Sequence, residues 1–323
     1  MEAPVGLGVV GVGRMGSEHA RIIARLVPEA RLVGIADVDI AAARRLGDEL
    51  GVAGVFDSAA ALAAAPGVQG VLIAVSTSHH LEVVRAVAAE GRAILCEKPL
   101  ALTLADTDSA ISTAEAAGVR LQVGFMRRWD PEYQRAHERL ATGSCGRPTL
   151  FKSLQFDGGP PPVAYADPAV SGGIMVDMGI HEFDLARWLM ADEVVEVHAW
   201  GSVLAHPHLA TVGDVDSAVV ALRFAGGAIG TVELARSNVA GDEVRTEVLG
   251  TSGAVHVGER LVVGEPREPI FEHAYAGQVR AFARAIADDG PVEVGGTEAR
   301  AALGIALAAR RSLEAGRPVS VTQ

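Results

Sequence analysis

The sequence predicts an α/β protein in which a doubly wound parallel sheet comes first and a second α/β domain with an open, largely antiparallel sheet follows. Short apolar strands alternate with helical patterns over residues 1–123, which is typical of a parallel sheet with helices on both faces. A Gly-x-Gly-x-x-Gly sequence stands at residues 11–16, between the first strand and the first helix. Between residues 194 and 257, strand-like runs follow one another without intervening helices, which favours antiparallel or mixed pairing.

The first domain is defined by alternating elements. We expect strands at residues 5–10, 31–36, 71–75, 94–96 and 120–123, and helices at 17–26, 40–50, 80–90 and 104–117. Gly91 and Gly118 follow two of these helices and are suitable C-terminal caps, because glycine adopts the left-handed conformation without strain. An alanine-rich stretch at 59–65 fits a further short helix.

The second domain begins near Gly124, so we expect domains at 1–123 and 124–323. Helices are expected at residues 133–141, 179–190, 274–288 and 297–313, and strands at 149–156, 194–203, 217–224, 228–235, 243–249 and 254–257. Glycine and proline are frequent in residues 157–167, which predicts a loop. Thr297 is a suitable N-cap for the final helix, a candidate to pack back on the first domain.

Composition argues against several functional classes. The 323 residues suggest two domains, and a formal net charge of −12 argues against general affinity for nucleic acid or anionic membranes. The two cysteines, Cys96 and Cys145, have neither zinc-site nor disulfide spacing. The sequence has no N-terminal signal pattern and no apolar run of about 18 residues. We therefore expect a cytoplasmic protein with a small-molecule partner and no bound metal.

The glycine-rich sequence predicts a dinucleotide-binding Rossmann domain. Residues 11–16 read Gly-Val-Gly-Arg-Met-Gly. In this pattern the first glycine makes a tight turn, the second lets a pyrophosphate approach the backbone, and the third lets helix and strand pack closely. The N-terminus of the following helix offers amide donors and a favourable dipole to phosphate. We expect the cofactor to be bound here by Gly11, Gly13, Arg14, Met15 and Gly16.

An acidic residue at the end of the second strand favours NAD over NADP. Asp37 stands about 20 residues beyond Gly16 and could accept hydrogen bonds from the ribose hydroxyls of the adenosine. A 2′-phosphate there would meet like charge, although Arg14 could pair with such a phosphate. The alternative is that Asp37 only caps the next helix. Candidates to line the nicotinamide, or alternatively to cap the helix after the third strand, are Ser76, Thr77 and His80.

Glu97-Lys98-Pro99 follows the short apolar strand at 94–96. A charged pair at the end of a buried strand is costly to bury without partners, but a lysine at the carboxyl edge of a parallel sheet can face a ligand. We therefore expect Glu97 and Lys98 near the cofactor, with Lys98 able to hydrogen-bond the reacting oxygen of a substrate. The alternative for Lys98 is a structural ion pair with a neighbouring carboxylate.

Asp177 and His181 stand four residues apart, at or just before the helix expected from residue 179. This spacing can place both side chains on one face. His181 could then act as a general base toward a substrate hydroxyl, and Asp177 could orient its imidazole. The alternative for His181 is a core histidine satisfied by a backbone carbonyl.

Several of these segments resemble the Gfo/Idh/MocA oxidoreductase family, and most closely its inositol 2-dehydrogenase group. The similar segments are residues 96–101, which contain the family's Glu-Lys-Pro signature, residues 122–130 and residues 172–184. The resemblance implies a Rossmann domain followed by an α/β domain with an open sheet, and a catalytic set of Lys98, Asp177 and His181. It also implies a cis Lys98-Pro99 peptide and a homodimer or homotetramer that covers one face of the open sheet.

Three segments depart from the resemblance. The first is Ala74-Val75-Ser76-Thr77, which stands where the family often has Ala-Thr-Pro-Asn. Residues 155–162 differ from the substrate loop of the best-known inositol enzymes, and Ala235-Arg236 stands where some of them have a tyrosine. These departures leave the identity of the substrate open. Besides the catalytic set, the candidates for substrate binding are Arg127, Gln155, Asp157 and Arg236.

The motifs together predict an NAD-dependent dehydrogenase that oxidises a secondary hydroxyl of a cyclitol or sugar to the ketone. The alternatives are an NADP-linked sugar or glycoside oxidoreductase, a dehydratase or isomerase with tightly held NAD, and a non-catalytic dinucleotide-sensing regulator. Such a regulator would be expected to lose catalytic groups, whereas this chain retains Lys98, Asp177 and His181.

Overall fold

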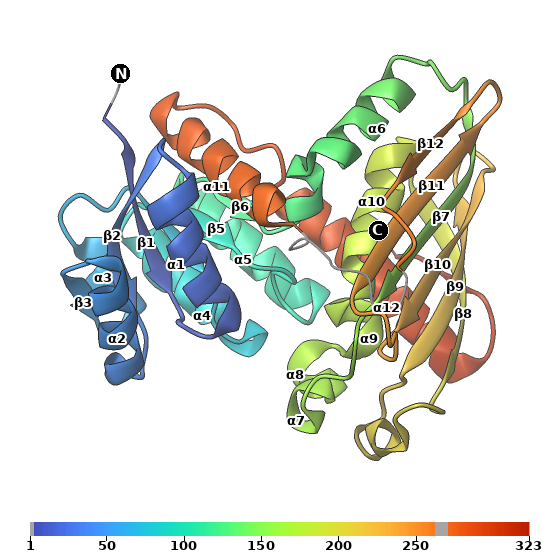
Figure 1. The fold of residues 1–323 in the computed structure, drawn as a ribbon, viewed down its shortest axis with the longest axis horizontal. Helices are drawn as coiled ribbons and strands as arrows, with labels where there is room; N and C mark the ends of the chain where they lie inside the picture. The colour runs from blue at the N-terminus through green and yellow to red at the C-terminus, as the bar shows by residue number, and fades with distance from the viewer. Residues whose placement is uncertain (1–2, 262–270, 323) are drawn as a thin grey trace. The chain divides into compact units, whose positions relative to one another are not determined.

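The computed structural model describes residues 3–261 and 271–322, which divide into two compact units (Figure 1). The first unit holds the described residues up to Trp129 together with residues 271–300. The second unit holds the remaining described residues, from Asp130 onward. Helix α12 (Gly296–Ala315) begins in the first unit and ends in the second.

The first unit is built on a six-stranded parallel sheet with strand order β3-β2-β1-β4-β5-β6. The strands are β1 (Val5–Val10), β2 (Ala30–Ala36), β3 (Gly54–Phe56), β4 (Gly70–Ile73), β5 (Ala93–Cys96) and β6 (Leu121–Val123). The strand order reverses between β1 and β4, where such sheets bind ligands at the carboxyl ends of the strands. The expected parallel sheet is confirmed, and β3 is an addition that is too short to show a periodic pattern.

Among the described residues, six α-helices lie wholly in this unit, and one of them comes from far along the chain. They are α1 (Arg14–Leu26), α2 (Ile40–Leu50), α3 (Ala59–Ala64), α4 (His80–Ala89), α5 (Leu104–Ala116) and α11 (Glu272–Ala287). Leu7 of β1, Ile22 of α1 and Phe282 of α11 share one buried core. The burial of Phe282 explains why residues 271–300 belong to the first unit, since removing its ring from water favours this arrangement.

The second unit is built on a seven-stranded sheet with strand order β12-β11-β7-β10-β9-β8-β13. The strands are β7 (Pro148–Phe156), β8 (Val194–Ser202), β9 (Ser217–Phe224), β10 (Ile229–Ala235), β11 (Glu243–Gly250), β12 (Ala254–Val257) and β13 (Val319–Ser320). Among the described pairs only β7 and β10 run parallel, so the expected, largely antiparallel sheet is confirmed.

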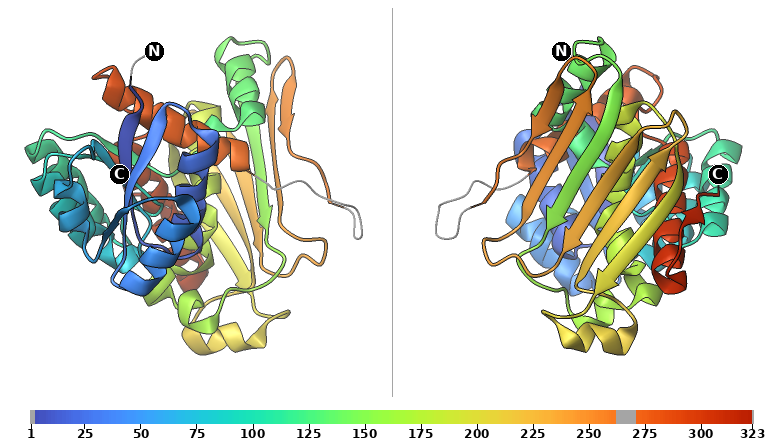
Figure 2. Two further views of the ribbon diagram at one scale, coloured as in Figure 1. Left: turned by 60° about the vertical axis from the view of Figure 1, so that its left-hand side comes forward. Right: turned by 90° about the vertical axis from the view of Figure 1, so that its right-hand side faces the viewer.

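One face of this second sheet carries helices and the other is open. Helix α10 (Gly179–Met190) contacts β7 and β10, and most of its residues are buried. In the right-hand view of Figure 2, no described helix covers the face of the sheet turned toward the viewer. On this open face Trp200, Val219 and Ile229 are 55%, 43% and 57% exposed. Exposed side chains alternate with buried ones along β9, as expected for a sheet with one face in the core.

Short helices connect β7 to α10. The segment runs through α7 (Val163–Ala166), α8 (Pro168–Ser171) and α9 (Gly173–Asp177), and α6 (Pro131–Ala141) precedes β7. The loop expected over residues 157–167 is therefore wrong at its C-terminal end. A single turn such as α7 has no amphipathic repeat, so the periodicity of the sequence could not reveal it.

Candidate active site

The glycine turn after β1 has the geometry of a phosphate cradle. Gly11 has a φ of +91°, and a Cβ on Gly16 would lie 1.8 Å from the Gly11 carbonyl oxygen, so α1 can follow the turn at once only with glycine at both positions. A Cβ on Gly13, in contrast, would meet nothing within 4 Å. Gly13 stands at the N-cap position of α1, and no described side chain caps the N–H groups of the first turn. Open space beside the uncapped helix N-terminus fits an anionic ligand.

The neighbouring Arg14 and Met15 open helix α1. Arg14 is exposed and Met15 is half-buried. The helix was expected from residue 17 and begins three residues earlier. Both side chains therefore lie on the first turn of α1, at the helix N-terminus where the cofactor is expected to bind.

Asp37 follows β2 and is hydrogen-bonded to the glycine turn. Its Oδ2 accepts a hydrogen bond from the Val12 N–H at 2.7 Å, and its Oδ1 accepts one from the Asp39 N–H at 2.8 Å. The N-cap of α2 is Asp39, whose carboxylate accepts hydrogen bonds from two helix N–H groups. Asp37 is therefore held beside the glycine turn, and the alternative in which it merely caps α2 is wrong.

The segment after β4 lies at the same sheet edge. Ser76 is exposed and precedes the 3-10 helix η1 (Thr77–His79). His80 is 1% exposed, with Nδ1 2.9 Å from the Pro99 carbonyl oxygen and Nε2 3.1 Å from the Val75 carbonyl oxygen. Burial lowers the pKa of His80, and the two carbonyls oppose that shift. His80 thus ties the end of the β4 segment to the turn after β5.

The Glu97-Lys98-Pro99 segment follows β5, and its Lys98-Pro99 peptide is cis, as the family resemblance implied. Glu97 is 9% exposed and accepts hydrogen bonds from His19 Nε2 at 2.6 Å and from the Lys98 N–H at 3.2 Å. Burial by itself raises the pKa of Glu97, but the bond from His19 and the charges of His19 and Lys98 outweigh it, so the pKa lies below its ordinary value. The charge of Glu97 therefore has identifiable partners.

His19 was missed by reasoning from the sequence, although a signal was present. It is a polar residue on the buried stripe of α1, together with Ala20 and Ile23. The ring of Tyr275 from α11 contacts it edge-on at 5.3 Å between centroids. The pKa of Tyr275 is raised by burial and by the charge of Glu97. No local pattern could reveal that Tyr275, so distant in the sequence, lies here.

Arg127 lies in the 3-10 helix η2 (Met126–Trp129) and is 2% exposed. Its guanidinium carbon lies 5.2 Å from the centroid of the Phe271 ring, which is a cation–π geometry. Both residues belong to the first unit. The expected contact between Arg127 and a polyol stays a prediction.

Asp177 and His181 lie on either side of a break between two helices. Asp177 ends α9, Met178 interrupts the helix, and His181 stands in the first turn of α10. His181 is 6% exposed, and its backbone N–H donates to the Met178 carbonyl oxygen at 3.3 Å. The break means that the four-residue spacing spans two helices and not one.

A buried arginine holds Asp177. Arg236 is fully buried, with Nη1 2.5 Å from Oδ2 of Asp214 and Nη2 3.5 Å from Oδ2 of Asp177. Oδ1 of Asp214 accepts a hydrogen bond from the Ile174 N–H at 3.0 Å, which ties the start of α9 to the same cluster. Tyr165 of α7 donates its hydroxyl to Oδ1 of Asp177 at 3.1 Å. Of these partners, Asp214 and Tyr165 were missed by reasoning from the sequence.

Gln155 and Asp157 join this cluster because β7 and β10 are parallel and end together. Phe156 pairs with Ala235 in register, so the residues that follow both strands meet at one edge. Gln155 donates from Nε2 to Oδ1 of Asp157 at 3.1 Å. Burial raises the pKa of Asp157, as do the charges of Asp242 and Asp177, whereas Gln155 and Arg236 lower it. The second unit thus brings together four of the expected site residues, Gln155, Asp157, Asp177 and Arg236.

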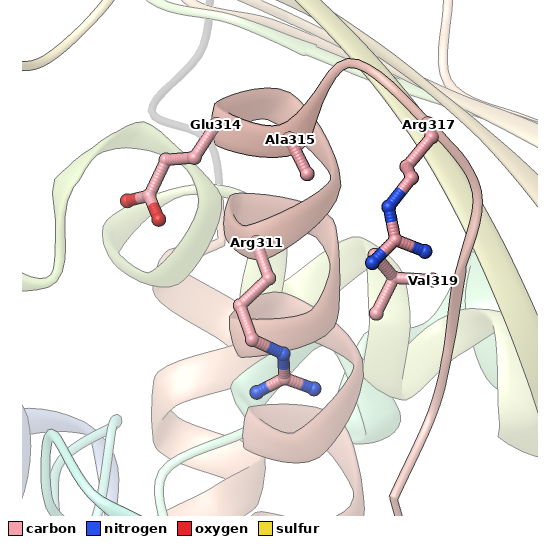
Figure 3. A pocket seen from close by; sticks show the side chains of 5 residues that line it. All are labelled: Arg311, Glu314, Ala315, Arg317 and Val319. Carbon is pink, nitrogen blue, oxygen red and sulfur yellow. The ribbon is translucent and has the colours of Figure 1, made fainter.

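A surface hollow elsewhere in the second unit contains none of the expected residues. It is lined by Arg311, Glu314, Ala315, Arg317 and Val319 (Figure 3). Glu314 is ion-paired with Arg310 at 3.0 Å. In residues 3–261 and 271–322, no group of His, Cys, Asp or Glu side chains is arranged to hold a metal ion, and no helix is long and apolar enough to cross a bilayer.

The fold and the glycine turn are those of a dinucleotide-binding protein, and comparison with known proteins supplies the enzyme class and the family. Residues 5–125 match the oxidoreductase family with an NAD-binding Rossmann fold, and residues 133–256 match the GFO/IDH/MocA C-terminal domain. The chain therefore belongs to the GFO/IDH/MocA oxidoreductase family, as the sequence motifs had indicated. The predicted enzyme class, an NAD(P)-dependent oxidoreductase acting on CH–OH groups, is confirmed, and so is the predicted cofactor, NAD.

Several inositol dehydrogenases are similar to this chain over its full length. The chain is 36% identical to the myo-inositol 2-dehydrogenase of Thermotoga maritima, with 98% of each chain covered. It is 32% identical to the scyllo-inositol 2-dehydrogenase (NAD(+)) of Bacillus subtilis, with 99% of this chain and 97% of the relative covered. The crystal structure of scyllo-inositol dehydrogenase from Lactobacillus casei with bound NAD(H) and scyllo-inositol matches with a TM-score of 0.89 at 26% identity, covering 99% of this chain and 100% of that one.

Proposed function

We propose that the protein is an NAD-dependent dehydrogenase that oxidises a secondary hydroxyl of a cyclitol or sugar to the ketone. The observation that carries the proposal is the gathering of Gln155, Asp157, Asp177 and Arg236 at one sheet edge, next to the helix that bears His181. Carboxylate and amide groups are suited to hydrogen-bond the hydroxyls of a polyol. The inositol dehydrogenases among the relatives support the same substrate class.

The first unit would bind the cofactor. Gly11, Gly13 and Gly16, with the first turn of α1, would hold the pyrophosphate, and Asp37 would accept hydrogen bonds from the adenosine ribose. Bound NAD would supply the acceptor for the hydride that leaves the substrate carbon. The remaining cofactor contacts are proposed for Arg14, Met15, Ser76, Thr77, His80, Glu97 and Lys98.

Three side chains would take part in removing the proton from the reacting hydroxyl. His181 would accept the proton of the reacting hydroxyl, and Lys98 would donate a hydrogen bond to the same oxygen as its negative charge develops. Asp177 would orient the imidazole of His181, and Arg236 and Tyr165 hold the Asp177 carboxylate. Ketone reduction would use the same groups in reverse. Lys98 and Arg127 are also proposed to bind the substrate.

The open sheet is the proposed oligomer interface. Trp200, Val219 and Ile229 expose apolar surface on the face that no described helix covers. We propose that this face is buried in a homodimer or homotetramer of a cytoplasmic enzyme. The domain boundaries expected from the sequence, 1–123 for the NAD domain and 124–323 for the substrate and oligomerisation domain, stay a proposal in which α11 of the second segment packs in the core of the first unit. A mass measurement in solution tests the oligomer, and a monomer at micromolar concentration would contradict it.

The proposed activity is tested by mixing the protein with NAD and a panel of inositols and aldoses and following NADH absorbance. Turnover of at least one cyclitol or sugar is the expected result. Cofactor binding without turnover of any polyol would instead favour a dinucleotide-sensing regulator. Cofactor that copurifies and never exchanges would favour a dehydratase or isomerase.

Exchanging Asp37 for serine should weaken NAD binding and shift the preference toward NADP. The carboxylate that would meet a 2′-phosphate is lost, and so are its bonds to Val12 and Asp39. We expect the ratio of the dissociation constants for NAD and NADP to change at least about tenfold, the equivalent of one charged hydrogen bond. Titration of both cofactors against wild type and Asp37→Ser measures this ratio. An unchanged ratio would mean that Asp37 does not determine the preference for NAD over NADP.

Two glycine variants should separate binding from folding. Gly13→Ala adds a Cβ into open space, so the melting temperature should stay near wild type while NAD affinity falls, because the methyl group occupies the space proposed for pyrophosphate. Gly16→Ala places a Cβ against the Gly11 carbonyl oxygen and should destabilise the fold. Thermal unfolding and NAD titration on both variants check the contrast. Full NAD affinity in Gly13→Ala would contradict the proposed phosphate position.

A further inference from the structure

His19 and Glu97 form a buried pair next to the peptide of Lys98. His19 lies on α1 with no exposed surface, and its Nε2 is 2.6 Å from Oε1 of Glu97. The second carboxylate oxygen, Oε2, accepts a hydrogen bond from the Lys98 N–H at 3.2 Å. A continuous set of contacts therefore runs from α1 through Glu97 to Lys98.

The imidazole of His19 is directed at Glu97 alone among the described residues. Its Nδ1 is buried and has no hydrogen-bond partner there. Its other ring contact, with Tyr275, is edge-on, with an interplanar angle of 88°. Because Nε2 faces a carboxylate, it must carry a hydrogen and donate it, and such charge-assisted bonds are short and strong. The ring thus supports Glu97 directly and does more than fill space.

Glu97 needs this donor to remain a buried carboxylate. Burial raises its pKa, and the hydrogen bond from His19 is the largest effect that opposes burial. The backbone of Gly124 packs against the carboxylate, since a Cβ at Gly124 would lie 3.2 Å from Oε2. Little room is left for Glu97 to move toward another partner.

Several titratable or charged groups lie around this carboxylate on other elements. Burial and the charge of Glu97 both raise the pKa of Cys96 and of Tyr275. Burial lowers the pKa of His80, and the charge of Glu97 opposes this shift. Arg14, Arg127 and Glu18 act on Tyr275 as well, the two arginines lowering its pKa and Glu18 raising it. The ionised Glu97 is therefore the centre of a coupled group, and His19 is its hydrogen-bond donor from α1.

We propose that His19 is a positioning residue for Lys98: by holding the Glu97 carboxylate, it sets the peptide from which the Lys98 side chain extends. His80 holds the next peptide through the Pro99 carbonyl oxygen at 2.9 Å, so the segment is fixed on both sides of Lys98. The inference rests on the proposed function, in which Lys98 contacts the reacting oxygen.

The test compares His19→Ala with His19→Gln, using the best substrate of the panel. Alanine removes the donor, whereas the glutamine amide can place an N–H close to the position of Nε2. We expect His19→Ala to lower kcat about ten- to a hundredfold, the equivalent of one charged hydrogen bond. The KM for NAD should change much less, and His19→Gln should recover most of the rate. His256→Ala, on the exposed side of β12, is the matched histidine control.

The pH profile distinguishes positioning from packing. In the wild type the lowered pKa keeps Glu97 ionised through the neutral range. His19→Ala removes the largest effect that opposes burial, so we expect the pKa of Glu97 to rise. The kcat of this variant should therefore fall as the pH drops through the raised pKa and recover as the pH increases. A parallel loss at every pH would mean a packing defect and would overturn the proposal.

A double variant separates failure of this inference from failure of the proposed function. If His19 acts through Lys98, His19→Ala should cost little further activity in a Lys98→Ala background. Full activity of Lys98→Ala alone would defeat the proposed function. Loss of activity in Lys98→Ala, together with a wild-type kcat in His19→Ala or no rescue by His19→Gln, would defeat only the role of His19. NAD titration and thermal unfolding verify that each variant is folded.

Discussion

Replacing His181 with alanine should lower kcat about 10²–10⁴-fold, the usual contribution of a general base. His181 is 6% exposed and lies in the first turn of the buried helix α10, and the residue four positions earlier, Asp177, is ion-paired with Arg236. Removing the imidazole leaves water to accept the proton from the reacting hydroxyl. Initial rates of NADH formation with the best substrate measure the loss.

The control for this prediction is His208→Ala, because His208 is an exposed histidine of the second unit. It should keep the wild-type rate. Lys98→Ala should lose a comparable factor to His181→Ala, since it removes the hydrogen bond that stabilises the developing charge on the oxygen. If His181→Ala turned over the substrate as fast as the wild type, His181 would be a core histidine and not a catalytic one.

Replacing Arg236 with methionine should be the most destabilising single substitution in the second unit's site. Arg236 is fully buried, and its loss leaves the Asp214 carboxylate, 5% exposed, without a counter-charge. Breaking a buried ion pair by removing one partner costs about 3–5 kcal/mol. The kcat should also fall, because the Asp177 carboxylate loses its ion pair with Arg236. Urea unfolding and initial rates measure the two effects.

A second substitution separates the two effects of Arg236. In Arg236→Met with Asp214→Asn, the uncompensated charge is gone and the asparagine oxygen can still accept from the Ile174 N–H. Stability should partly return, while activity should not, because Asp177 still lacks its arginine. Arg223→Met is the surface control, since its ion pair with Glu196 is exposed and worth about 1 kcal/mol or less. Equal stability losses in Arg236→Met and Arg223→Met would contradict the structural role of Arg236.

The Rossmann sheet could be predicted from the sequence because its signals are local. The glycine turn, the buried strand β1 and the helix α1 are adjacent in the chain, and the close contact that requires Gly16 is with the Gly11 carbonyl oxygen of the same turn. The elements that were missed include β3, α7, α8, α9 and β13, which have between two and five residues. Such lengths show no periodicity, and their existence depends on neighbours that the chain supplies elsewhere.

Reasoning from the sequence found individual site residues more readily than their partners. Asp177 and Lys98 stand in recognisable motifs, but Asp214 and Tyr165 carry no local signal. Asp214 is brought to Arg236 over 22 residues of chain, and Tyr165 reaches Asp177 from a single helical turn. Arg236, expected as a polyol contact, is fully buried in the structure between two carboxylates. Its substrate contact stays a prediction.

The sequence by itself determined the fold class, the family, the enzyme class and the cofactor, because these depend on short motifs whose spacing is visible along the chain. The tertiary structure alone decided which groups support them: His19 behind Glu97, Tyr275 of α11 in the first unit, and Arg236 between Asp177 and Asp214. The physical reason is that a buried charge must find its partner in space. That partner is chosen by the packing of distant elements and leaves no periodic trace in the sequence.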